Sequence, residues 1–115
     1  MRQIWRRYCI EFRHPSWHQE EVFCLLEQYG VAYCVMSGAH LPCLLRATAS
    51  FVYVRLHGPD PEHLYAGSYS DQDLAWWKDR IQEWATMGKD VFVYFNNDGE
   101  GNAVRNADIL QQMLA

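Results

Sequence analysis

Residue types that can bind or transform a ligand gather at the ends of three apolar stretches. Residues 11–14 read EFRH, residues 55–58 read RLHG and residues 94–98 read YFNND. If the apolar stretches are parallel β-strands, these polar groups meet at one edge of a sheet. The carboxyl ends of parallel strands are where α/β folds bind ligands. The sequence therefore predicts the location of a site, but these residues alone do not identify its reaction.

Arginine and histidine at these strand ends favour the binding of an anion and the transfer of a proton. Arg55 and His57 share one strand face, as do Glu11 and Arg13, because side chains alternate along a strand. Guanidinium groups contact phosphate or carboxylate in a planar, bidentate way, so Arg13 and Arg55 are predicted to hold the anion. His57, together with Glu11, is the predicted acid or base. The structural alternative is an interior ion pair between Glu11 and Arg55.

Other residues of the same edge have both a functional and a structural interpretation. Asn97 is predicted to orient the ligand through its amide, or else to tie neighbouring loops together. Tyr69, in an aromatic loop with Tyr65, is predicted to stack on the ligand, or else to cover the mouth of the fold. His14, which precedes a proline, can equally shape the turn after it.

No motif supports a metal, a cofactor or a common hydrolase. Glu11, His14, His57 and Asp98 are suitable ligand types, but they show no local HxH or HExxH spacing. The sequence contains no Walker loop, GxSxG elbow or GxGxxG fingerprint. We therefore expect neither a bound metal nor a cofactor, and the residues leave open whether the protein is an enzyme.

Composition is typical of a single globular domain over residues 1–115. Half of the residues are hydrophobic and the formal charge is −4, which argues against disorder and against broad nonspecific binding of nucleic acid. No apolar run is long enough to span a bilayer, and the N-terminus lacks the apolar core of a signal peptide. We expect a cytoplasmic protein without a membrane partner. A local basic groove for nucleic acid stays open, made of Arg2, Arg6, Arg7, Arg13 and His14.

The spacing of the cysteines also favours a cytoplasmic location. Their spacing contains no CxxC pair, and each lies in or beside an apolar segment. This pattern favours buried, reduced thiols over disulfides or metal ligands. The residues concerned are Cys9, Cys24, Cys34 and Cys43.

The spacing of apolar residues predicts strands that alternate with helices. Strands are predicted over residues 7–12, 31–36, 51–56 and 90–95, and helices over 17–29 and 71–87, with a last helix after the loop 96–101. Residues 37–49 are predicted to form a long connection. Strands separated by helices pair in parallel through right-handed crossovers.

Capping residues mark the predicted helix ends. The pairs Ser16–Gln19 and Ser70–Asp73 have the spacing of capping boxes. Gly30 and Gly88 directly follow the predicted helices and are expected to end them. Trp76 and Trp77 fall inside the second helix, where we expect them to pack or to form an interface.

Five segments of the chain are distinctive in combination, namely residues 11–17 (EFRHPSW), 51–58 (FVYVRLHG), 65–70 (YAGSYS), 93–98 (VYFNND) and 103–107 (AVRNA). Together they resemble the YecE-like family, which is also called domain of unknown function 72. The resemblance implies a TIM-like (β/α)8 barrel, an architecture that takes about 250 residues. The chain resembles the C-terminal half of such a barrel, beginning at its fifth strand. The family has no settled activity.

A half-barrel, meaning four parallel strands with helices on one side, has two open edges and one open face. Two copies can close an eight-stranded barrel about a twofold axis. We therefore expect a homodimer, or a complementary chain that closes the barrel.

The sequence supports two functional hypotheses. In the first, the protein binds or processes an anionic, phosphate-containing ligand at the carboxyl ends of the strands. In the second, it is a non-catalytic half-barrel that acts as a dimerising scaffold or as a complement to another chain.

Overall fold

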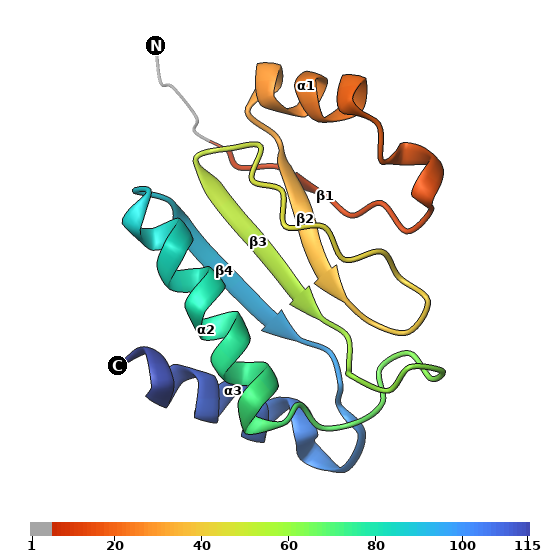
Figure 1. Ribbon diagram of the computed structural model, residues 1–115, viewed down its shortest axis with the longest axis vertical. Coiled ribbons are helices and arrows are strands. Elements are labelled where there is room, and N and C mark those ends of the chain that lie inside the picture. The colour runs from red at the N-terminus through yellow and green to blue at the C-terminus, as the bar shows by residue number, and fades with distance from the viewer. Residues whose placement is uncertain (1–5) are drawn as a thin grey trace.

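A computed structural model describes residues 6–115 as a four-stranded parallel sheet with three α-helices (Figure 1). Arg2, part of the predicted basic groove, lies outside the described residues. The strands lie side by side in the order β1-β2-β3-β4. The elements are β1 (Cys9–Ile10), α1 (Glu20–Tyr29), β2 (Ala32–Ser37), β3 (Phe51–Leu56), α2 (Asp71–Thr86), β4 (Asp90–Phe95) and α3 (Asn102–Leu114), with 3-10 turns η1 (Pro15–Trp17) and η2 (Gly99–Gly101).

The predicted α/β class and parallel pairing are confirmed, and β3 and β4 have their predicted bounds. The first strand is much shorter than predicted, because only Cys9 and Ile10 pair with β2. Beyond them the chain bends toward η1, where the rings of Phe12 and Trp17 stack with centroids 5.0 Å apart. The residues after Ile10 are therefore placed by side-chain contacts rather than by a strand ladder.

The first predicted capping box is wrong. The segment 15–17 forms the turn η1, which His14 caps by accepting a hydrogen bond from Ser16 N at Nδ1 (3.1 Å). Helix α1 begins only at Glu20, and its N-cap, Gln19, makes no capping bond with its side chain. Proline at the first position of η1 favours this turn.

The second capping box is confirmed at the start of α2. The Ser70 hydroxyl accepts from Asp73 N (3.0 Å), and the Asp73 carboxylate accepts from Ser70 N (3.2 Å). The two bonds satisfy amide groups that a helix start leaves without partners.

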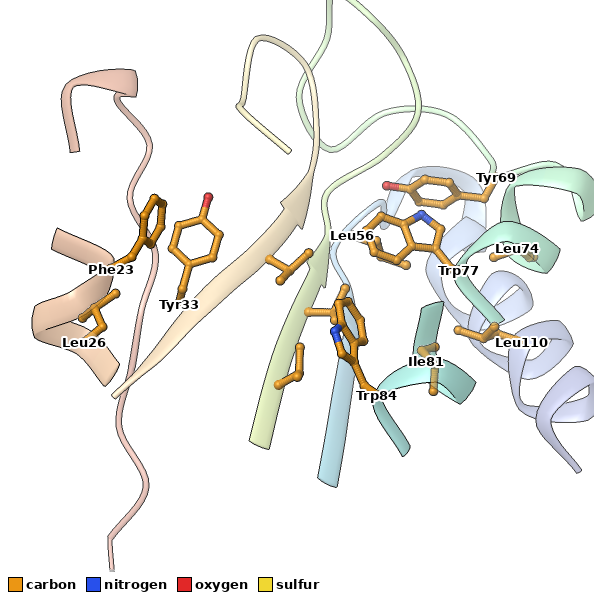
Figure 2. Packing of buried hydrophobic residues seen from close by; sticks show 13 residues of the cluster. Phe23, Leu26, Tyr33, Leu56, Tyr69, Leu74, Trp77, Ile81, Trp84 and Leu110 are labelled. Atoms are coloured by element: carbon orange, nitrogen blue, oxygen red, sulfur yellow. The ribbon is translucent and has the colours of Figure 1, made fainter. Parts of the chain in front are cut away.

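All three helices pack on one face of the sheet, which we call the helix face (Figure 1). Helix α2 buries Leu74, Trp77, Ile81 and Trp84 there, and α3 adds Leu110. Figure 2 shows Phe23 of α1 beside Tyr33 of β2, apart from the α2 residues that pack near Leu56. Each such side chain contributes about 1.5–3 kcal/mol when it leaves water.

The other face, which we call the open face, exposes aromatic side chains. Phe92 is 38% exposed and Tyr94 is 51% exposed, although each pairs with a ring of β3. Phe51 meets Phe92 edge-to-face at 6.1 Å, and Tyr53 stacks on Tyr94 at 5.1 Å. The open face is formed by Cys9, Ala32, Cys34, Met36, Phe51, Tyr53, Arg55, Phe92 and Tyr94.

The four cysteines are all free, and their burial differs from the prediction. Cys34 is buried and Cys9 is half-buried, but Cys24 and Cys43 are exposed. Cys24 lies on the outer side of α1, whose buried residues are Phe23 and Leu26. Within residues 6–115, every helix is too short or too polar to cross a membrane.

Gly58 allows the loop after β3 to fold back tightly next to His57. Its φ is +118°, and a Cβ there would lie 2.3 Å from the carbonyl oxygen of Ala66. Its backbone N–H donates to the Tyr69 hydroxyl (2.9 Å). The glycine is therefore required both by the backbone angle and by the close approach of the loop.

Gly58→Ala is expected to lower the free energy of unfolding by more than the about 1–2 kcal/mol that a left-handed backbone costs an alanine. The excess arises because the new methyl group collides with the Ala66 carbonyl. Gly30→Ala is the matched control, since Gly30 has φ +63° and no atom within 4 Å of the added carbon. Urea unfolding measures both losses, and equal losses would contradict the role of the close approach.

Candidate functional site

The Glu11 carboxylate is the centre of a charged cluster at the carboxyl ends of the strands. Its Oε1 accepts hydrogen bonds from His57 Nε2 (3.1 Å) and Arg55 Nη1 (3.3 Å). Its Oε2 accepts from Arg13 Nε (2.6 Å). The structure thus brings together four of the six residues that the sequence nominates for a site.

Strand alternation explains why Arg55 and His57 point the same way, whereas Glu11 comes from beyond the end of β1. Arg55 belongs to β3 and His57 follows its last residue at the next position of the same face. Glu11 approaches from the segment just past β1, on the far side of β2. Cys34 of β2 lies between them and donates its thiol hydrogen to Glu11 Oε1 (3.6 Å).

Burial differs sharply within the cluster. The His57 side chain is fully buried and that of Glu11 is 15% exposed, whereas Arg55 and Arg13 are 30% and 41% exposed. Both guanidiniums therefore reach the surface while their shared carboxylate stays below. With an ionised Glu11 and a neutral His57, the two arginines leave the cluster with a net positive charge.

The pKa values of Glu11 and His57 are both lowered. Burial alone would raise the pKa of Glu11, but hydrogen bonds from Arg13 and His57 outweigh it and the carboxylate stays ionised. For His57, burial is the main cause and lowers its pKa, and the charges of Arg55 and Arg13 act in the same direction, against the opposing bond to Glu11. His57 is therefore neutral at pH 7.

A neutral His57 that donates from Nε2 to Glu11 presents a lone pair at Nδ1. This tautomer follows from the hydrogen bond, because an ionised carboxylate can only accept. Within residues 6–115, Nδ1 is buried without a hydrogen-bond partner. Buried polar atoms are nearly always paired, so this unpaired imidazole nitrogen is an exception that core packing does not explain.

Tyr65 covers the cluster from the loop after β3. Its ring meets the His57 imidazole edge-to-face with centroids 5.3 Å apart, and its hydroxyl accepts from Arg13 Nη2 (3.2 Å). The backbone of Tyr65 has φ +66°, which is strained for a large side chain. The sequence predicts Tyr65 in this loop, but no spacing signal reveals its contact with Arg13.

Two adjoining hollows open beside Tyr65. The first has a volume of about 320 Å³ and is lined by Arg55, Tyr65, Asn96, Asp98 and Gly99. In it, Asn96 Oδ1 accepts from Arg55 Nε (3.3 Å) and Nη2 (3.1 Å). The second, of about 410 Å³, shares Tyr65 and Gly99 and extends along residues 66–68 toward Glu100 and Asn102.

Asn97 and Tyr69 lie in a separate buried network. Asn97 Nδ2 donates to the Gly67 carbonyl (2.9 Å) and to Asn106 Oδ1 (2.8 Å). Asn106 Oδ1 also accepts from Tyr69 N (3.0 Å). The structure thus places both Asn97 and Tyr69 in contacts that tie loops together, which is the structural alternative stated for Asn97 but not the one stated for Tyr69. Asn106 is absent from the predicted site residues, although it lies between Ala103 and Leu110 on the buried side of α3.

Within residues 6–115, no three histidine, cysteine, aspartate or glutamate side chains are grouped to hold a metal ion. His14 is exposed and bonded to Ser16, so it serves the turn η1. Asp98 lies at the rim of the first hollow.

Comparison with known proteins shows the family of the chain. Residues 1–115 match the family model described as "Protein of unknown function DUF72". The chain is 30% identical to the UPF0759 protein YunF of Bacillus subtilis (strain 168), over 91% of this chain and 45% of that protein.

Solved structures agree with this match. A DUF72 family protein from Thermotoga maritima MSB8 superposes with a TM-score of 0.85 at 28% identity, over 95% of this chain and 46% of that one. A DUF72 family protein from Enterococcus faecalis V583 has a TM-score of 0.85 at 22% identity, over 94% and 47%. The chain thus spans about half the length of these relatives, and its sheet and helices are part of a larger fold. It belongs to the DUF72 family, as the resemblance to YecE-like proteins predicted.

Proposed function

We propose that the protein binds an anionic ligand carrying a phosphate or carboxylate group at the Glu11 cluster. The observation that carries the proposal is the pair of partly exposed guanidiniums that converge on one buried carboxylate. Glu11 neutralises only one of the two charges and holds both arginines in place. An anion that reaches them therefore meets pre-positioned donors, which lowers the entropy lost on binding.

Free donors point to the same chemistry. Arg13 Nη1 has no partner within residues 6–115, and Arg55 Nη1 and Nη2 each make a single bond there. An arginine has five N–H donors in a planar fork that matches a phosphate or carboxylate. The hollow at Arg55 and Asn96 gives such an anion room, although the Asp98 carboxylate at its rim opposes the arginine charge.

His57 is the residue that we propose as acid or base for this ligand. Glu11 fixes its tautomer, and the unpaired Nδ1 supplies the lone pair. Because the ring is buried beneath Tyr65, the ligand must displace Tyr65 to reach it. The free cysteines fit a reducing, cytoplasmic setting for this activity.

A second candidate function is that of a half-barrel completed by a second copy of this chain. The exposed rings of Phe92 and Tyr94 favour it, as does an apolar hollow of about 320 Å³ between α2, β4 and α3. The outer strands carry opposite charges that would have to change partners on assembly, because Arg7 beside β1 already pairs with Asp90 at the start of β4 of the same chain (2.8 Å). In a twofold assembly each strand β4 would meet the β1 segment of the partner, and the same charges would face each other at both seams.

Arg55→Ala is expected to abolish the rise in melting temperature that inorganic phosphate, sulfate or a nucleoside monophosphate causes in the wild-type chain. A ligand at 100 times its Kd stabilises a protein by about 2.7 kcal/mol, which a thermal melt detects. Arg46→Ala is the matched control, since Arg46 is 36% exposed and pairs with Glu20, away from the cluster. An equal ligand-induced shift in the Arg55 and Arg46 variants would contradict the proposed site.

Phe92→Glu is expected to convert a dimer to a monomer, because the new charge would lie in the assembled open face. Light scattering at micromolar concentration should give twice the 13.5 kDa mass of the chain for the wild type and a single mass for the variant. Val104→Glu, at a position of α3 that is 76% exposed, should leave the dimer intact. A wild-type chain that is monomeric and melts cooperatively would contradict the two-copy assembly. Binding of the chain to a separate polypeptide that forms the other barrel half would then identify a complementary chain.

Acidification from about pH 7.5 to pH 5 is expected to lower the free energy of unfolding. The unfolded chain takes up a proton at His57 near pH 6.5, but the folded chain resists because the pKa of His57 is lowered by burial. The lowered pKa of Glu11 acts in the same direction at still lower pH. His57→Gln should flatten the upper part of this dependence in urea titrations, whereas the exposed His63→Gln should not. Equal curves for the two variants would show that His57 does not resist protonation.

A further inference from the structure

A fourth hollow lies on the helix side of the strand ends, outside the Glu11 cluster. Its volume is about 280 Å³. Three segments form it, namely the end of β2, the loop after β3 and the first two turns of α2. Its lining residues are Ser37, Pro59, Tyr69, Asp73, Trp76 and Trp77.

Trp76 is the residue of this hollow that core packing does not explain. Its side chain is 42% exposed, whereas the neighbouring Trp77 is 5% exposed and belongs to the core. The two indoles meet edge-to-face with centroids 5.0 Å apart. The Arg80 guanidinium lies 4.9 Å from the Trp76 ring and is itself held by Glu83 through two hydrogen bonds. A large exposed indole is thus fixed in orientation at the rim.

One hydrogen-bond donor and one acceptor lie in the same hollow. Ser37 Oγ accepts from the Tyr69 hydroxyl (3.2 Å), which accepts in turn from Gly58 N (2.9 Å). This direction leaves the Ser37 hydroxyl hydrogen free to donate. Asp73 uses Oδ2 to cap α2, and its Oδ1 has no partner within the described residues 6–115.

The charges of this hollow disfavour an anion, because the full negative charge of the Asp73 carboxylate exceeds the partial positive charge at the N-terminal end of α2. The lining favours a molecule with hydroxyl groups for the polar atoms and a flat apolar side for the indole. Ligand sites of this kind combine aromatic walls with a few placed polar groups.

We propose that this hollow binds a pyranose sugar, with one face of the sugar ring on the Trp76 indole and its hydroxyls on Asp73 Oδ1 and Ser37 Oγ. The volume is at the lower limit of ligand pockets, about 300 Å³, so one ring fits. This site is separate from the Glu11 cluster, because Ser37 faces the helix side and the cluster belongs to the open face. It does not depend on the proposed anion binding.

Saturation-transfer NMR on the full chain tests the proposal with a panel of free monosaccharides, among them glucose, galactose, mannose and N-acetylglucosamine. We expect at least one sugar to bind at millimolar concentration with its ring protons closest to the protein. Trp76→Ala should weaken that sugar about tenfold or more, and Trp76→Phe should restore part of the loss, because stacking remains. Asp73→Asn, which keeps an oxygen for the cap, should weaken binding through loss of the charged acceptor.

Trp17→Ala is the matched control, since Trp17 is an exposed indole, 52% exposed, at the turn η1. It should leave sugar binding unchanged. Circular dichroism shows whether each variant is folded. If Trp76→Ala is not folded, the comparison of Trp76→Phe with Trp17→Ala tests the proposal. The proposal is overturned if no sugar of the panel binds, if Trp76→Phe and Trp17→Ala lose binding equally, or if tetramethylammonium binds in place of sugars.

Discussion

The Glu11 carboxylate holds the first segment of the chain to the centre of the sheet. Strand β1 pairs at only two residues, so its backbone ladder contributes little to fixing the segment after it. Glu11 instead reaches across β2 to Arg55 and His57, which belong to the end of β3. Removing one partner from a largely buried charge costs about 3–5 kcal/mol in general, so the cluster stabilises the position of this first segment.

Strands β3 and β4 could be predicted to the residue, because each alternates cleanly and ends at a turn signal. Val52, Val54 and Leu56 face the helices, while the residues between them face the other way. The first helix could not be placed as well. Ser16 and Gln19 have the right spacing for a capping box, but Pro15 and the His14 ring favour a separate turn. Spacing alone does not distinguish these local solutions, since both satisfy the same backbone amides.

The grouping of the candidate site could be predicted only where a strand positions the side chain. Strand alternation fixes the shared direction of Arg55 and His57. Glu11 lies beyond the ladder of β1 and joins them through its side-chain hydrogen bonds. Asn97 and Tyr69 are held by loops, and their direction depends on Asn106, which comes from a helix late in the chain. No periodic signal connects such segments. The structure supplies these loop contacts, and they place the polar groups in two networks rather than one.

The peptide amides around His57 connect the two faces of the strand end. His57 N donates to the Ser37 carbonyl (2.7 Å) and Gly58 N donates to the Tyr69 hydroxyl, so this short segment extends the β2–β3 ladder beyond β3 itself. Such buried amide bonds open only with large parts of the domain, unlike those of an exposed loop. The imidazole therefore keeps its place on the timescale of global unfolding. The position of His57 is thus set by backbone hydrogen bonds, whereas the Tyr65 ring above it is held by side-chain contacts with His57 and Arg13.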